Sequence, residues 1–220
     1  HYAIIDSGGV SPNVVQAHAT VLYMVRANRV ADSVKLQERV DKIAQGAAMM
    51  TDTRFDRVFI DGTAELLPNY TIEKLLQANM ELVGAPSYDE QDLAFARALR
   101  ATYEAETDPP GIGAKCDEQI ARQVRDLTEN MTKPINDFVM PLYSGNVFIP
   151  GSTDVGDVSW LTPTSQVDIV TWPAGLPHHS WQVVSCGKSG LAHKGLLMAA
   201  KVLAATAIDL MEKPEALQAA

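Results

Sequence analysis

A small-residue turn, a histidine pair and a long apolar run follow one another near the C-terminus, and together they constrain the fold most. Gly151–Trp160 (GSTDVGDVSW) places Asp154 and Asp157 beside hydroxyls and glycines. Pro177–Trp181 (PHHSW) then brings two adjacent histidines onto a short loop. The run Ala192–Met211 is apolar nearly all round, which predicts a buried helix. A loop that gathers His and Asp ahead of a helix suits metal or anion binding, although paired histidines also occur as plain surface residues.

Composition and charge narrow the class of protein. With 220 residues, 46% of them hydrophobic, the chain can form one large domain or two small ones. The formal net charge of −9 argues against nucleic-acid binding, which needs clustered Lys and Arg. No uncharged apolar run reaches the roughly 18 residues of a membrane span. The two cysteines, Cys116 and Cys186, indicate reduced thiols in a cytoplasmic protein, and the start at His1 suggests a processed chain or a piece of a longer one.

Residues 1–69 predict a small α+β domain. Ala17–Val25 and Arg54–Thr63 are rich in strand-forming residues, and the second alternates apolar with charged side chains. Arg29–Met50 lies between them and repeats apolar residues at near-helical spacing, as an amphipathic helix does. A helix on one face of a sheet is the expected arrangement.

Residues 70–220 predict helices followed by the strands of an α/β sheet. Thr71 is the expected cap of the first helix, and Ser87 with Glu90 forms a capping-box pattern for the second. The expected helices are Ile72–Val83, Tyr88–Ala105, Asp117–Asn130 and the C-terminal run, and the expected strands are Asn146–Ile149 and Gln166–Thr171.

Two groups of motifs resemble one enzyme family. GSTDVGDVSW, PHHSWQ and GKSGLAHKGLLMAAK, in that order, resemble the C-terminal end of the metal-dependent aminoacylase/carboxypeptidase amidohydrolases. Near the N-terminus, Gly8, Gly9, Asn13 and Arg26 resemble the family's inserted lid: two glycines, Asn-Val-Val, and a strand that ends in Arg. The resemblance implies a ferredoxin-like α+β lid/dimerisation portion over 1–69 and a portion of the α/β catalytic domain over 70–220. Such lids pair across a two-fold axis, which implies a homodimer.

The resemblance also implies substrate-binding roles. Asn13 and Arg26 would hold the substrate's carboxylate and the oxygen of the scissile amide, a role that suits the planar fork of Arg. Gly151, Ser152 and Thr153 would approach the free carboxylate through backbone N–H groups and a hydroxyl. The simpler alternative is that Asn13 makes a turn and Arg26 pairs with a surface acid.

His179 corresponds to the family's last metal ligand, for zinc or manganese. His178 and His193 would lie beside it; the two adjacent histidines could exchange roles, and a structural role for His193 stays open. Asp154 and Asp157 are expected to stabilise turns, because two acids with this spacing are a weak calcium signal.

By resemblance, the chain is the C-terminal part of a hydrolase that cleaves an acyl–amino acid amide such as p-aminobenzoyl-glutamate with a metal-activated water. The family supplies its general base and most metal ligands from its N-terminal half, and this sequence contains no His-x-Asp or Glu-Glu pair. We therefore assign no catalytic residue here, and expect an N-terminal half or a partner subunit to complete the site. The alternative is a non-catalytic dimerisation or binding module.

Overall fold

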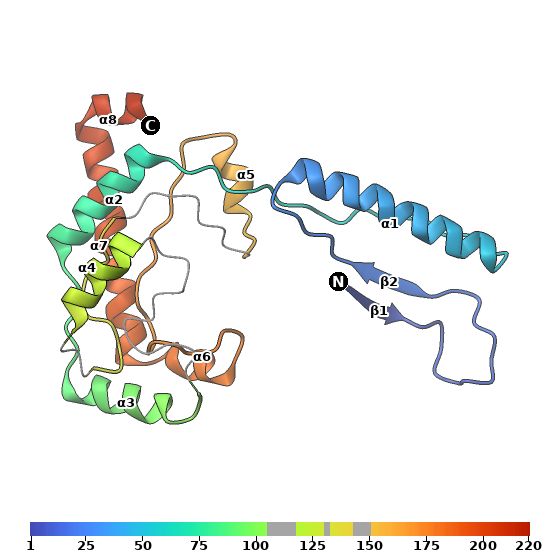
Figure 1. The fold of residues 1–220 in the computed structure, drawn as a ribbon, viewed down its shortest axis with the longest axis horizontal. Coiled ribbons are helices and arrows are strands. Elements are labelled where there is room, and N and C mark those ends of the chain that lie inside the picture. The colour runs from blue at the N-terminus through green and yellow to red at the C-terminus, as the bar shows by residue number, and fades with distance from the viewer. Residues whose placement is uncertain (105–117, 130–132, 143–150) are drawn as a thin grey trace. The chain divides into compact units, whose positions relative to one another are not determined.

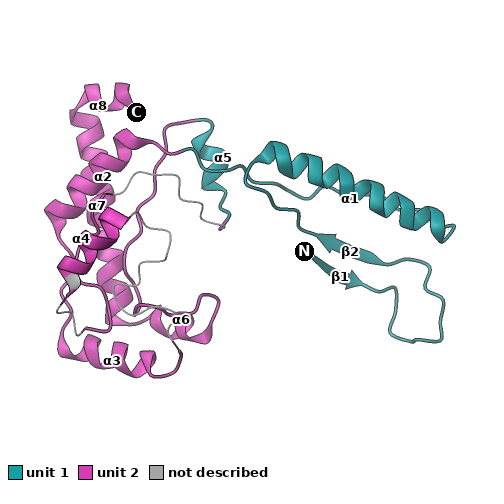
Figure 2. Cartoon of the chain, viewed as in Figure 1, with its two compact units in different colours: residues 1–67, 152–161 teal, residues 68–151, 162–220 magenta. Residues whose placement is uncertain are grey.

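The computed structural model describes residues 1–104, 118–129, 133–142 and 151–220 (Figure 1). The chain divides into unit 1, residues 1–67 with 152–161, and unit 2, residues 68–151 with 162–220 (Figure 2). The division between residues 67 and 68 lies close to the boundary expected between residues 69 and 70. Ser152–Leu161, expected with the second domain, instead packs within unit 1. The expected strand Asn146–Ile149 lies outside the described residues.

Unit 1 begins with a β-hairpin followed by a long helix. Strands β1 (Tyr2–Asp6) and β2 (Thr20–Tyr23) pair antiparallel, with Tyr2 opposite Tyr23. Helix α1 (Val30–Met50) confirms the predicted helix almost to the residue. Its first N–H, from Val30, donates to the carboxylate of Glu65 at 2.9 Å, which holds the pKa of Glu65 below its ordinary value.

The apolar side chains of unit 1 remain largely uncovered. In this fully described stretch no residue of β1, β2 or α1 is buried. The predicted strand Arg54–Thr63 is wrong, because these residues have no regular structure, and Val58 and Ile60 are 82% and 69% exposed. Alternation alone does not make a strand; a pairing edge is also needed, and the β1–β2 hairpin pairs with no third strand among the described residues.

A short helix, α5 (Val155–Ser159), joins unit 1 from far along the chain. The Ala64 N–H donates to the Asp157 carboxylate and the Leu67 N–H to the Ser159 hydroxyl, each at 2.9 Å. A Cβ on Gly156 would lie 2.1 Å from the carbonyl oxygen of Ala64, so only glycine permits this approach. Three specific contacts therefore explain why α5 packs with unit 1.

Unit 2 contains helices and, among its described residues, no strand. They are α2 (Tyr70–Val83), α3 (Glu90–Arg100), α4 (Glu118–Thr128), α6 (Trp181–Cys186), α7 (Gly190–Glu212) and α8 (Pro214–Ala219). The helices were predicted within a few residues, except that α3 ends earlier than expected and α6 and α8 were not foreseen. None of the described helices is long and apolar enough to cross a membrane.

The two predicted caps in unit 2 were wrong. Asn69, not Thr71, caps α2 by accepting the Ile72 N–H at 3.0 Å. Asp89 caps α3 and forms a reciprocal box with Asp92, whereas Ser87 and Glu90 do not. A carboxylate is a good acceptor at a helix N-terminus because it also meets the positive end of the helix dipole.

Helix α7 is central to the core of unit 2. Two clusters of buried apolar residues form this core: Ala96, Leu99, Ile135, Leu176, Cys186 and Leu191 in one, and Leu76, Met198 and Val202 in the other. Helix α7 contributes to both, as its apolar sequence predicts. Gln166–Thr171 runs alongside as an extended segment that has no strand partner among the described residues, so the predicted strand is not formed.

Candidate functional site

Arg26 and Ser152 lie together in unit 1 although 126 positions separate them. The Arg26 guanidinium donates to the Ser152 hydroxyl oxygen at 3.5 Å, the long end of the hydrogen-bond range. Both side chains are exposed and therefore open to a small molecule. A cation beside a hydroxyl is the chemistry that recognises a carboxylate. Two of the predicted substrate-binding residues thus come together.

The loop that carries Ser152 is fixed by α5. The Thr153 hydroxyl accepts the Val155 N–H at 3.3 Å, which orders the chain directly after Ser152. Asp157, already bonded to the Ala64 N–H, anchors the other end, so this carboxylate is occupied by a backbone group. At Gly151 a Cβ would meet none of the described atoms within 4 Å, so packing does not demand glycine there.

The glycine–asparagine motif of unit 1 lies in the connection between β1 and β2. Gly8 adopts φ +76°, and a Cβ on it would lie 2.1 Å from the carbonyl oxygen of His18, so the tight turn requires glycine. The Asn13 amide oxygen accepts a hydrogen bond from the Ser11 hydroxyl within the same loop. This local bond corresponds to the turn-making alternative for Asn13.

The histidine pair lies in unit 2, in the turn before α6. His179 has a left-handed backbone, φ +58°, which is uncommon for a residue with a side chain. The ring of His178 stands edge-on to that of Trp172, with centroids 5.8 Å apart. Both histidines are exposed. The structure therefore presents the His179 imidazole at the surface, while His178 is directed by an aromatic contact.

His193 lies in the first turn of α7. Its side chain lines a cavity of about 290 Å³ together with Thr171, Trp172 and Leu196. Cys186 forms part of the same wall, and burial raises the pKa of its thiol, so it is poorly suited as a nucleophile. The cavity is mainly apolar.

The predicted metal needs more ligands than these residues supply. Among the described residues, no three or more His, Cys, Asp or Glu side chains gather where they could hold a metal ion. Structural and catalytic metal sites take at least three protein ligands. The described part of the chain therefore does not fit a complete metal centre, and we derive no reaction step through one.

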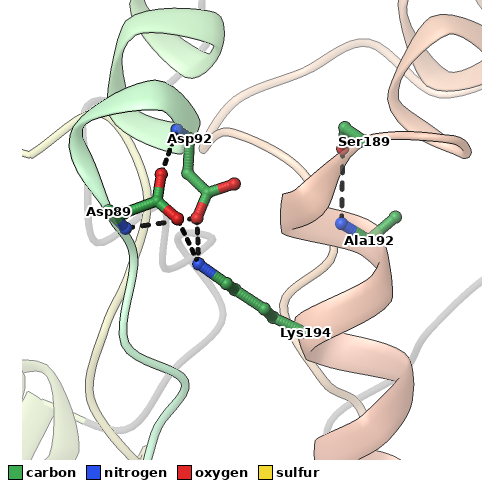
Figure 3. Close-up of polar contacts among 5 residues, drawn as sticks. All are labelled: Asp89, Asp92, Ser189, Ala192 and Lys194. Carbon is green, nitrogen blue, oxygen red and sulfur yellow. Dashed lines mark hydrogen bonds and ion pairs between the residues drawn. The ribbon is translucent and has the colours of Figure 1, made fainter.

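Sequence reasoning missed a charged cluster that joins α3 to α7. Lys194 Nζ donates to Asp89 Oδ2 at 3.0 Å and to the carboxylate of Asp92 (Figure 3). The pKa of Asp89 is held below its ordinary value, mainly by the hydrogen bond from the Asp92 N–H and secondly by Lys194. The pKa of Lys194 is raised above its ordinary value, mainly by Asp92 and secondly by Asp89. The spacing of the two acids was a detectable sign of a capping box. No sequence pattern indicated their pairing with Lys194, which lies more than one hundred positions away.

The chain matches one curated hydrolase subunit over nearly its whole length. It is 40% identical over 213 residues to one of the subunits of the p-aminobenzoyl-glutamate hydrolase of Escherichia coli (strain K12), a match that includes 96% of this chain. The chain is a homologue of this hydrolase subunit. The resemblance inferred from the two groups of motifs is thereby confirmed.

The match spans only 44% of the relative's length. No protein-family model and no solved structure matches the chain. In the present chain the predicted site residues divide between the two units. Asn13, Arg26, Ser152 and Thr153 belong to unit 1, and Gly151 lies directly at its border. The histidines His178, His179 and His193 belong to unit 2. Of these, the described contacts bring Arg26 and Ser152 together.

Proposed function

We propose that this chain is one part of a hydrolase that cleaves the amide bond between an acyl group and an amino acid. p-Aminobenzoyl-glutamate is the first candidate substrate, because the homologous subunit is named for its hydrolysis. The observation that carries the proposal is the contact between Arg26 and Ser152, two motif residues, in an exposed position. In this proposal unit 1 is part of a lid and unit 2 part of the catalytic domain.

Arg26 and Ser152 would receive a carboxylate of the amino-acid product half. The guanidinium offers parallel N–H donors to the two carboxylate oxygens. The Ser152 hydroxyl accepts from Arg26 through its oxygen, so its own O–H can serve as a third donor. Thr153 keeps the loop in place through its bond to the Val155 N–H. These residues bind and orient the substrate; none of them carries out the bond cleavage.

The chemistry itself would need groups from outside this chain. A divalent zinc or manganese ion would supply an activated water, and His179 would contribute one ligand to it. The remaining ligands and the general base would come from the polypeptide that corresponds to the unmatched part of the relative, or from a partner subunit. The name of the relative, a subunit, agrees with such an assembly.

Unit 1 would also form the homodimer contact. Both strands of the hairpin are exposed, and β1 and β2 display Tyr2, Ile4 and Tyr23 at 70%, 64% and 54% exposure. An uncovered two-stranded sheet is marginal by itself, and pairing with a second copy would cover it.

The test is hydrolysis by a complete assembly, made by co-expressing this chain with the unmatched part of the E. coli subunit and its partner subunit. We expect release of p-aminobenzoate, and Arg26→Ala should raise KM about ten- to hundredfold, since a hydrogen bond to a charged group contributes roughly 1.5–3 kcal/mol. The matched control is Arg39→Ala on the exposed surface of α1, which should keep the wild-type KM. An assembly that binds but never hydrolyses the substrate would support the non-catalytic module instead.

A further inference from the structure

The cavity of about 290 Å³ in unit 2 lies where α6 ends and α7 begins. The end of α6 supplies Val183, Cys186 and Gly187 to its wall, and the first turns of α7 supply Ala192 and His193. An apolar cavity of about 150 Å³ already holds benzene, and small-molecule pockets begin at roughly 300 Å³. The volume is therefore enough for one aromatic ring with its substituents and for little more.

Trp172 gives the cavity an aromatic wall whose position is already fixed. Its half-buried side chain packs against the core cluster that contains Cys186 and Leu191, and the His178 ring stands edge-on to it at 5.8 Å. Aromatic rings attract one another in such stacked or edge-on arrangements beyond the burial of their area. Because His178 directly precedes His179, the cavity also adjoins the turn that carries the candidate metal ligand.

The opposite wall is kept free of a side chain at Gly187, although the backbone does not require glycine there. The residue has an ordinary helical φ of −58°, and a Cβ on it would make only normal contact, 3.5 Å from the carbonyl oxygen of Val184. The neighbouring Cys186 thiol stays neutral because burial raises its pKa. Thr171 and His193 add polar side chains to a wall that is otherwise apolar. A flat aromatic group with a polar substituent matches these walls better than a charged group does.

We infer that this cavity receives the aromatic acyl group of the substrate, a single benzoyl ring that carries an amino group. The inference rests on the proposed function, in which p-aminobenzoyl-glutamate is the first candidate substrate. Arg26 and Ser152 were assigned to the amino-acid half, and the cavity supplies the binding residues for the other half. Trp172 contacts the ring, and a neutral His193 imidazole accepts a hydrogen bond from the aromatic amine.

Binding of p-aminobenzamide to the purified chain tests the inference without relying on activity. This probe keeps the ring, the amine and the uncharged carbonyl of the acyl group, and it lacks the glutamate. Titration followed by amide NMR should give saturable shifts at Trp172, at the end of α6 and in the first turns of α7. Cyclohexanecarboxamide, which is similar in size but not aromatic, should bind at least about threefold more weakly.

Two variants that fill the cavity should weaken this binding. Ala192→Leu adds three carbon atoms to the wall and should raise the dissociation constant at least about tenfold, because overpacked groups cannot share the space. Gly187→Ala adds one methyl group where the backbone tolerates it, and should raise the constant at least about threefold. The matched control is Ala204→Leu on the exposed surface of α7, which should bind like the wild type. Far-UV circular dichroism checks that each variant keeps its helices, and Gly187→Ala decides the question if Ala192→Leu does not fold.

The complete assembly shows whether the cavity serves the acyl group during hydrolysis. Ala192→Leu should raise KM for p-aminobenzoyl-glutamate at least about tenfold. Inhibition by N-acetyl-glutamate should stay within about twofold of the wild type, because its small acyl group does not reach the added side chain. General damage to the fold would instead weaken both ligands.

Three results would overturn the inference. They are the absence of saturable shifts around the cavity, equal binding of p-aminobenzamide by the wild type and Gly187→Ala, and shifts at the same residues that grow with the concentration of the chain alone, which would make a second copy the occupant. Failure of the proposed function is distinguishable from these. An assembly that binds p-aminobenzamide in the cavity but hydrolyses no p-aminobenzoyl-glutamate would refute the hydrolase and leave the ring site standing. An active assembly whose KM is unchanged in Ala192→Leu would refute the ring site alone.

Discussion

Two helix-interior glycines allow a controlled test of how α7 packs. In an exposed helix, alanine is about 0.8–1 kcal/mol more favourable than glycine. At Gly46 in α1 a Cβ would meet nothing within 4 Å, so Gly46→Ala should stabilise the chain by nearly that amount. At Gly195 in α7 a Cβ would lie 2.4 Å from the Val170 oxygen and 2.8 Å from the Thr171 methyl carbon, closer than real contacts allow.

The clash at Gly195 should outweigh the gain in helix propensity. Overpacking typically costs about 1–3 kcal/mol, and the upper part of that range, about 2–3 kcal/mol, applies here because a backbone carbonyl cannot rotate aside as a flexible side chain can. After the propensity gain of at most about 1 kcal/mol, Gly195→Ala should destabilise the chain by roughly 1–2 kcal/mol. The two alanine variants should therefore differ in stability by about 2–3 kcal/mol, with opposite signs relative to the wild type.

Urea unfolding followed by far-UV circular dichroism measures both values. Amide exchange in α1 and α7 assigns each change to its own helix, so that separate unfolding of the two units does not confuse the result. Equal stabilisation by both substitutions would refute the reasoning. Helix α7 would then not lie against the Val170 backbone.

The remaining predictions concern stability and local opening of the structure. Leu191→Ala, at a fully buried side chain, should cost about 2–5 kcal/mol in urea unfolding, whereas Leu196→Ala, at a side chain that is 67% exposed, should stay within about 0.5 kcal/mol. The lowered pKa of Asp89 stabilises the fold above the ordinary pKa near 3.9; the stability difference between wild type and Asp89→Asn should therefore vanish as pH falls below about 4. The raised pKa of Lys194 has the opposite effect on the pH dependence of stability. The stability difference between wild type and Lys194→Met should persist up to about pH 10 and disappear above it. A stability difference that does not change with pH, for Asp89→Asn or for Lys194→Met, would contradict the ion pairing. Gly8→Ala should open the hairpin connection, seen as faster amide exchange in β1 and β2, because a Cβ would meet the His18 carbonyl at 2.1 Å; unchanged exchange would count against this turn.

The helices of this protein were predictable because each carries its own signal. Apolar spacing located α1, α2 and α7 to within about two residues, since helical hydrogen bonds are satisfied inside the segment. The strands were not predictable in the same way. Arg54–Thr63 and Gln166–Thr171 have strand-like sequences, but a strand also needs a partner, and the described residues give them none.

The candidate site was predictable only in part. Resemblance identified Arg26 and Ser152, and their contact depends on α5 docking on Ala64 and Leu67, which no local pattern reveals. The predicted caps of α2 and α3 were wrong because several acceptors compete within a few positions, and the sequence does not rank them. The Lys194 cluster requires two helices to meet, which is a property of the packed fold.

The most direct test of the central claim is whether Arg26 recognises a carboxylate in the complete assembly. The measurement compares KM for p-aminobenzoyl-glutamate with KM for the analogue whose free α-carboxylate is converted to an amide, in the wild type and in Arg26→Ala. We predict that the wild type prefers the carboxylate by about tenfold or more, and that Arg26→Ala loses this preference, because the charged partner is gone. An undiminished preference for the carboxylate in Arg26→Ala would contradict the proposed role of the Arg26–Ser152 pair.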